Sequence, residues 1–271
     1  MPRPVALVIG LLILAASGPT ISLANDATPG ASPVDHGVLP SLAIHAFPPD
    51  VEPEMTALGT FGHVIALQPG DTVVLALGVY DYERCGVSIQ CFLPVQIPAR
   101  WSVSPSNGAT TDPVSGELTI DASVPSGSEF TVTAEVDDGQ HAVTAEIYVY
   151  TPEGNPFVGF WREEAQFSCD DGAEVIPEFP IEELVFAADG SFAVTWQPFE
   201  SYVDYWGTYE FDLLKGTLGL TITSGNFVPD DTDGEGQFAV DDPGNLVLTG
   251  LWLGTSHSTT GPPNCGHRFS R

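Results

Sequence analysis

The chain of 271 residues carries 36 acidic residues against 7 Lys and Arg, a formal charge of −29, with 43% hydrophobic and 10% aromatic residues. This composition is too apolar for a disordered acidic segment, so we expect the charge to coat folded domains. Such a surface repels phosphate backbones and anionic lipid, which argues against nucleic acid or a membrane surface as the partner.

The first 24 residues have the features of a secretory signal peptide. Arg3 precedes an apolar run from Val5 to Ala16, and the small residues Ser22 and Ala24 precede an expected cleavage site. The apolar run is too short to span a bilayer. We therefore expect a secreted protein, extracellular or periplasmic, with no membrane insertion after the signal peptide (residues 1–24) is removed.

Cysteine usage agrees with export. The four cysteines are Cys85, Cys91, Cys169 and Cys265. In an exported chain they predict two disulfides, although four cysteines allow three connectivities. A zinc site is disfavoured because the cysteines form no CxxC pair and the six His are scattered.

Residues 25–45 are rich in Pro, Ala, Ser and Gly, and we expect this N-terminal segment to be flexible. Two regions with different patterns of apolar and polar residues follow it. From 46 to 151 the chain alternates apolar and polar residues in short runs separated by turn signals such as Asp138-Gly139. Short strands at this spacing predict a β-sandwich. Two prolines in residues 152–156 predict a linker.

Part of the first region resembles a known family. The segments Trp101–Ile120, Val124–Gly127 and Phe130–Ala134 look like the bacterial immunoglobulin-like (Big) domains of surface proteins. The resemblance implies an immunoglobulin-like sandwich with Trp101 in its core. Such domains usually act as spacers or adhesive modules.

Residues 157–271 are predicted to form eight strands, with no helical periodicity between them. The strands are expected at 157–167, 181–187, 191–197, 207–213, 216–224, 236–241, 245–253 and 265–271. Eight strands in hairpin succession suit an up-and-down β-barrel. The predicted fold is therefore all-β, an N-terminal immunoglobulin-like β-sandwich and a C-terminal eight-stranded up-and-down β-barrel.

The first of these strands carries a second resemblance. Gly159-Phe160-Trp161 resembles the Gly-x-Trp signature of lipocalin-like (calycin) barrels, in which an Arg of the last strand often packs across this Trp. Arg268 and Arg271 are available for that role. The resemblance implies that Gly159, Trp161 and one of these arginines form the structural base of a barrel.

The connections between these strands alternate in length. Those after the odd strands are long and those after the even strands are tight, so one end should be a loop-lined mouth. Cys169 ends the first strand and Cys265 begins the last, so both would lie at the mouth. A disulfide between them would join the first strand to the last at the seam where the barrel closes. If these cysteines share a face, alternation favours Arg271 over Arg268 as the partner of Trp161, unless a bulge shifts the register.

The predicted mouth carries one aromatic group as a candidate ligand site. Its residues are Phe199, Tyr202, Tyr205 and Trp206. Exposed rings could stack on sugars or line a pocket for an apolar ligand. The alternative is that this loop folds back and plugs its own barrel.

An acidic group at the mouth is a candidate Ca²⁺ site, formed by Asp230, Asp231, Asp233 and Glu235. Clustered carboxylates suit Ca²⁺, but the spacing does not match an EF-hand, and a solvated acidic turn is the favoured interpretation. Ser256 and His257 are adjacent, which does not define a catalytic triad. No other cofactor is implied.

These observations favour a secreted or cell-surface, non-catalytic binding protein with a small molecule or glycan at the barrel mouth. A surface protein is the other partner considered. The alternatives left open are a structural or adhesive module with a filled barrel, and a hydrolase that uses mouth-loop carboxylates.

Overall fold

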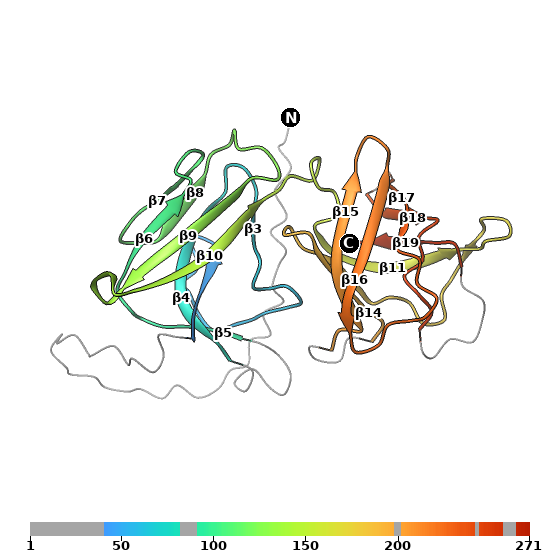
Figure 1. The fold of residues 1–271 in the computed structure, drawn as a ribbon, viewed down its shortest axis with the longest axis horizontal. Helices are drawn as coiled ribbons and strands as arrows, with labels where there is room; N and C mark the ends of the chain where they lie inside the picture. The colour runs from blue at the N-terminus through green and yellow to red at the C-terminus, as the bar shows by residue number, and fades with distance from the viewer. Residues whose placement is uncertain (1–40, 82–90, 198–201, 242–243, 257–263) are drawn as a thin grey trace. The chain divides into compact units, whose positions relative to one another are not determined.

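A computed structural model describes residues 41–81, 91–197, 202–241, 244–256 and 264–271. Within these ranges the protein is all-β, as predicted: strands form three sheets and no α-helix is present (Figure 1). None of the described segments is an apolar helix of the length needed to cross a membrane. The predicted signal peptide lies outside the described residues.

Two sheets precede residue 150. The first contains β1 (Leu42–Phe47), β2 (Thr56–Ala57), β4 (Thr72–Asp81), β5 (Cys91–Pro94), β7 (Ala109–Thr111) and β8 (Glu117–Ile120). The second contains β3 (Ile65–Leu67), β6 (Ala99–Ser104), β9 (Glu129–Val136) and β10 (His141–Val149). The short 3₁₀ element η2 (Asp137–Gly139) joins β9 to β10 at the predicted turn.

These two sheets share one hydrophobic core. Alternation along β9 turns Phe130 and Val132 inward, and Leu75 and Leu77 of β4 enter the same core from the other sheet. Trp101 of β6 is 7% exposed and lies in this core as well. The alternating runs therefore build two layers around a common interior.

The third sheet closes on itself. Its strands follow one another in chain order, and β11 pairs with β13 on one edge and with the last strand, β19, on the other. We call the closed part the ring sheet. Its strands are β11 (Gly159–Phe167), β13 (Glu183–Phe186), β14 (Ser191–Thr195), β15 (Tyr205–Asp212), β16 (Thr217–Gly225), β17 (Glu235–Val240), β18 (Leu246–Thr249) and β19 (Gly266–Ser270).

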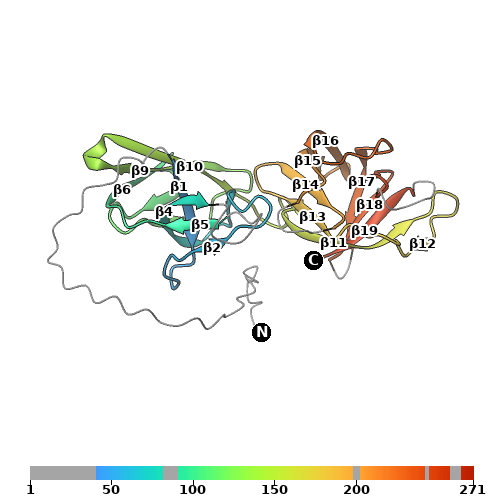
Figure 2. The same ribbon diagram turned by 90° about the horizontal axis from the view of Figure 1, so that it is seen from below.

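Each of the eight segments predicted as strands overlaps one strand of the ring sheet. The prediction lacked β12 (Glu174–Val175), which pairs with β11 only and follows it in a hairpin (Figure 2). Neighbouring strands are antiparallel, so alternate connections leave at the same end. The short ones, 187–190, 213–216 and 241–245, define the base, and the longer ones define the mouth.

Aromatic side chains fill the base end of the ring sheet. Phe157, which is fully buried just ahead of β11, is the centre of this cluster. Its ring centroid lies between 4.6 and 5.8 Å from those of Phe186, Tyr209, Phe211 and Phe238. These residues come from three different strands, β13, β15 and β17, so Phe157 packs against several parts of the ring sheet from inside.

The buried hydroxyl of Tyr209 makes stability depend on pH in the alkaline range. It donates to the Ala187 carbonyl at 2.8 Å and accepts from the Asn155 amide at 2.8 Å. Burial raises the pKa of Tyr209 from 10.0 to about 12. The pKa of Tyr209 is higher in the folded protein than in the unfolded chain. The contribution of its neutral hydroxyl to the unfolding free energy is therefore complete below pH 10 and is lost as pH rises through 12.

We therefore expect the wild-type protein to lose about 2 to 3 kcal/mol of unfolding free energy between pH 10 and 12 relative to Tyr209→Phe. At pH 8 the wild type should be more stable than the variant by about 1 kcal/mol, because the variant lacks the hydrogen bonds of the Tyr209 hydroxyl. Urea unfolding of both proteins from pH 8 to 12 measures the difference. If the unfolding free energies of the two proteins change with pH in parallel, the raised pKa of Tyr209 is contradicted.

Candidate functional site

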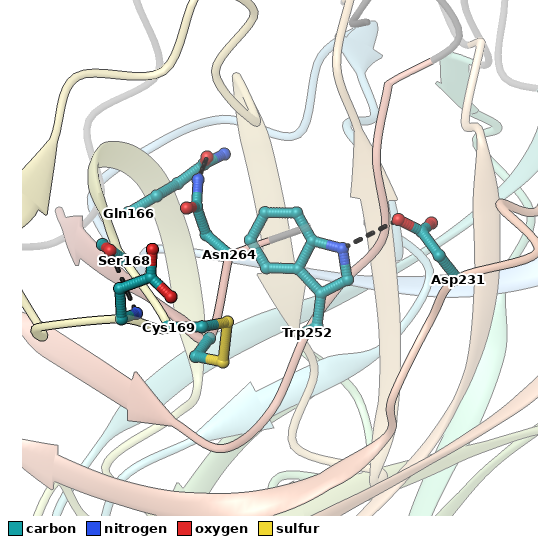
Figure 3. Close-up of a disulfide and its surroundings, with 8 residues drawn as sticks. Gln166, Ser168, Cys169, Asp231, Trp252 and Asn264 are labelled. Atoms are coloured by element: carbon teal, nitrogen blue, oxygen red, sulfur yellow. Dashed lines mark hydrogen bonds between the residues drawn. A yellow bond between two sulfur atoms is a disulfide. The ribbon is translucent and has the colours of Figure 1, made fainter. Parts of the chain in front are cut away.

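The mouth end of the ring sheet gathers most of its buried polar groups, and one disulfide fixes it. Cys169 and Cys265 are bonded, with Cα atoms 4.9 Å apart, which confirms the predicted pairing. The Cys265 amide donates to the Phe167 carbonyl at 2.8 Å, and Asn264 donates to the Gln166 side chain at 2.7 Å (Figure 3). The seam between β11 and β19 is thus closed covalently and by hydrogen bonds.

The other two cysteines lie ahead of the ring sheet. Cys91 begins β5, is fully buried and is also disulfide-bonded. Cys85 lies outside the described residues.

Trp252 and Asp231 form a second polar contact at the mouth. The Trp252 indole donates to Asp231 Oδ2 at 3.2 Å, and Figure 3 shows the indole nitrogen turned toward that carboxylate. The Thr255 amide and hydroxyl donate to the same carboxylate at 2.9 and 2.5 Å. Burial acts to raise the pKa of Asp231, but these hydrogen bonds outweigh it and hold that pKa below its ordinary value.

This arrangement does not bring the calcium candidates together. Asp231 is half-buried and turned toward Trp252 and Thr255, whereas Asp230, Asp233 and Glu235 are exposed. Among the described residues, no group of three or more His, Cys, Asp or Glu side chains could hold a metal ion. In this segment Asp231 accepts hydrogen bonds from Trp252 and Thr255, and Asp233 accepts one from the neighbouring Glu235 amide.

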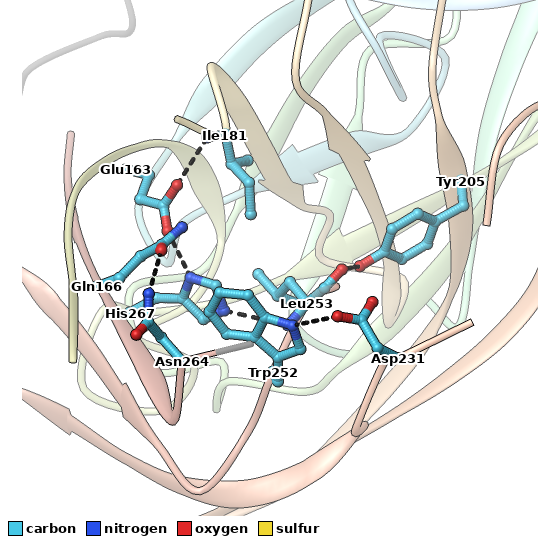
Figure 4. Close-up of polar contacts among 9 residues, drawn as sticks. All are labelled: Glu163, Gln166, Ile181, Tyr205, Asp231, Trp252, Leu253, Asn264 and His267. Carbon is cyan, nitrogen blue, oxygen red and sulfur yellow. Dashed lines mark hydrogen bonds and ion pairs between the residues drawn. The ribbon is translucent and has the colours of Figure 1, made fainter. Parts of the chain in front are cut away.

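The polar centre of the ring sheet is a pair that our sequence analysis did not single out, Glu163 of β11 and His267 of β19. Both side chains are fully buried, and His267 Nδ1 lies 2.5 Å from Glu163 Oε1 (Figure 4). The Ile181 amide donates to Glu163 Oε2 at 2.8 Å, and the Leu253 amide donates to His267 Nε2 at 3.1 Å. The Trp252 ring stacks on the imidazole with centroids 4.5 Å apart.

The aromatic ligand candidates do not form one surface. Phe199 lies outside the described residues, and Tyr202 is 43% exposed. Tyr205 is 1% exposed and donates its hydroxyl to the Leu253 carbonyl at 2.6 Å. Trp206 is half-buried and follows Tyr205 on a strand, so its side chain points to the opposite face.

Strand β15 explains this separation. It begins at Tyr205, two residues before the predicted start, so Tyr205 and Trp206 belong to a strand and not to the predicted loop. Burial raises the pKa of Tyr205 well above its ordinary value, and the charges of Asp204 and Asp231 raise it further. This side chain is part of the packed interior.

The three residues expected at the base lie together. Gly159 has a positive φ of 139°, a conformation that favours glycine. Trp161 is 2% exposed and donates its indole N–H to the Phe157 carbonyl at 2.6 Å. The Arg271 guanidinium carbon lies 4.5 Å from the Trp161 ring centroid, and Arg271 also donates to the Pro156 carbonyl at 3.0 Å.

Arg268 has a different role. Its guanidinium pairs with Glu174 of β12. The pairing of β11 with β19 shifts register between Glu163 and Ala165, yet Trp161, Glu163 and Ala165 all remain buried. The irregularity therefore does not displace Arg271 from Trp161.

Carboxylates near the mouth are engaged as acceptors. Asp204 is 2% exposed and accepts from the Trp196 amide at 2.8 Å, as Asp231 does from Thr255. Ser256 is 5% exposed, and His257 lies outside the described residues. These contacts hold loop backbone in place.

Glu163 could have been recognised from the sequence. Period-two alternation places it on the face of Trp161 and Ala165, where an acidic side chain is unusual. His267 lies two residues from Cys265 on the same face. A buried acid facing a His across the predicted seam was the available signal.

No family model matches the sequence, and no curated protein matches it. One solved structure, from Bacteroides ovatus, is described as a structural genomics protein of unknown function. It aligns with 84% of this chain and 92% of its own, with 11% identity and a TM-score of 0.27. A likeness at this level carries no argument about fold or function.

Proposed function

We propose that this chain is a non-catalytic structural or adhesive module of a secreted or cell-surface protein. In this proposal the ring sheet is a lipocalin-like, eight-stranded up-and-down barrel filled by its own side chains. The two N-terminal sheets are an immunoglobulin-like spacer, in keeping with the Big-like segment Trp101–Ala134. The Cys169–Cys265 disulfide supports an oxidising, extracytoplasmic setting.

The packing of the ring interior carries this proposal. Trp161, Phe186, Phe192 and Tyr205 are large, inward-facing and at most 2% exposed. They come from four strands around the ring, and all belong to one hydrophobic cluster. An interior occupied in this way suits a packed core better than a ligand cavity.

A hydrolase has less support. The buried carboxylates of Glu163 and Asp204 and the half-buried carboxylate of Asp231 each accept hydrogen bonds from backbone amides. Such contacts orient loops and leave these oxygens engaged. This arrangement favours a structural role for the acids.

Binding of a neutral apolar probe tests the filled interior. We expect wild-type protein to bind no 1-aminoanthracene at unit stoichiometry and to show no small-molecule adduct in native mass spectrometry. Phe192→Ala should gain one probe site, because an apolar cavity left by a buried ring accepts small aromatic molecules. Phe160→Ala is the matched control, since Phe160 is 42% exposed on the outer face.

A wild-type protein that carries a one-to-one ligand would overturn the filled barrel and support the ligand-binding alternative. A rise in melting temperature on addition of glycans would support sugar binding at the mouth, where Tyr202 offers an exposed ring. In that case the Tyr202→Ala variant should lose the shift.

A further inference from the structure

We propose that Glu163 and His267 form a proton-operated latch that holds the mouth segment 251–256 to the ring interior at neutral pH and releases it on acidification. This role is independent of what the module binds. It rests on the hydrogen-bond pattern around one buried imidazole.

The contacts of His267 define its protonation state. The Leu253 amide can only donate, so His267 Nε2, 3.1 Å away, must be the acceptor and carries no proton. The proton of the neutral ring is then on Nδ1, from which it is donated to Glu163 Oε1 at 2.5 Å. Glu163 Oε2 accepts from the Ile181 amide, so both carboxylate oxygens are acceptors.

A second proton cannot enter this arrangement without breaking a contact. On His267 Nε2 it would place one donor against another, the Leu253 amide. On Glu163 it would replace an acceptor by a donor, although both oxygens already receive N–H groups. Because the pair is fully buried, water cannot take over the lost bond in place.

Leu253 connects the loss of the His267 contact to the mouth segment. Its carbonyl accepts the Tyr205 hydroxyl at 2.6 Å, so its amide and carbonyl are both held by buried side chains. The preceding residue, Trp252, stacks on the imidazole and exchanges backbone hydrogen bonds with Asp233 at 2.8 and 2.9 Å. If the Leu253 peptide moves, it disturbs all of these attachments, of which Figure 4 shows those to Tyr205 and His267.

The other ionisable side chains near the pair have partners of their own. Tyr205 of β15 donates to the Leu253 carbonyl, Asp231 accepts from the Trp252 indole, and Asp233 pairs with Trp252 through its backbone. The basic side chains of the two seam strands, Arg162 and Arg268, pair with other acids, Glu182 and Glu174. The contact that a further proton on the imidazole would break is therefore the one with the Leu253 amide.

The release is confined to the segment because the seam has its own restraints. Cys169 and Cys265 are bonded, and His267 is paired by backbone with Gln166 on one side and Leu248 on the other. These ladder bonds do not involve the imidazole. We therefore expect a local opening at the mouth and an intact ring sheet.

Nuclear magnetic resonance of the ¹⁵N-labelled protein tests the latch at two points. At pH 7.5 the imidazole should show the Nδ1–H tautomer. Between pH 7.5 and 4.5 the exchange protection factor of the Leu253 amide, corrected for the intrinsic rate, should fall at least tenfold. The Leu248 amide of β18 should change less than twofold and serves as the internal reference.

Variants separate the latch from general acid sensitivity. His267→Gln removes the imidazole, so Leu253 protection should become independent of pH over this range. His141→Gln replaces an exposed His of β10 and should behave as wild type. If His267→Gln does not fold, the wild-type measurements decide alone.

Three results would overturn the proposal. The first is an Nε2–H tautomer in the wild type at pH 7.5. The second is Leu253 protection that stays constant, or falls only together with that of Leu248. The third is a folded His267→Gln variant with the wild-type pH dependence.

Discussion

Replacing Cys169 and Cys265 by Ser is expected to lower the unfolding free energy by about 4 kcal/mol. The disulfide spans 96 residues, so in the unfolded chain it closes a loop that contains six of the eight strands of the ring sheet, β13 to β18. Opening that loop releases chain entropy in the unfolded state. The native ladder between β11 and β19 remains in the variant, so the folded structure should change little.

Urea unfolding followed by tryptophan fluorescence measures this loss, because four of the five Trp residues lie in the ring sheet or its connections. The m-value should rise in the variant, since a less restricted unfolded chain exposes more surface. Ser168→Ala, next to Cys169, is the control and should cost no more than about 1 kcal/mol, because it removes one hydrogen bond from the Asp170 amide. A loss below about 1 kcal/mol would show that the disulfide does not restrict the unfolded chain as inferred.

Trp161→Ala should cost about 4 kcal/mol, the range expected for deleting a fully buried large aromatic side chain. The substitution removes the indole from the ring interior, its hydrogen bond to the Phe157 carbonyl, and the surface on which Arg271 lies. Phe157 is the centre of the base cluster, so its position should loosen as well.

Trp206→Ala is the matched control, because this residue is the same type in the same sheet but is half-buried on the outer face. We expect it to cost less than half as much as Trp161→Ala in the same urea assay. Equal losses for the two variants would mean that burial does not set the contribution of these side chains. Arg271→Ala should give an intermediate loss of about 1 kcal/mol by removing the cation from the Trp161 ring.

Local alternation made the strands predictable. Residues such as Phe130 and Val132 face inward because successive side chains on a strand point to opposite faces, and that rule needs no tertiary information. The same rule, applied to strands joined in succession, brought Cys169 and Cys265 to one end of the ring sheet.

The candidate site was less predictable because strand ends are not marked by alternation. Residues 199–206 were assigned to a loop, and the early start of β15 at Tyr205 turned one aromatic ring inward and its neighbour outward. Asp231 was likewise read as part of a solvated acidic turn, whereas Thr255 and Trp252, 24 and 21 residues away, make it a partly buried acceptor.

The sequence by itself determined the all-β class, the succession of short strands, the inward-facing positions along most of them and the pairing of one disulfide. Only the tertiary structure decided which buried polar groups meet. Glu163 and His267 are 104 residues apart, and their contact requires that β11 and β19 close the ring in one particular register. Alternation is a property of each strand alone, whereas that register depends on all the strands between them and on the irregularity beside Glu163.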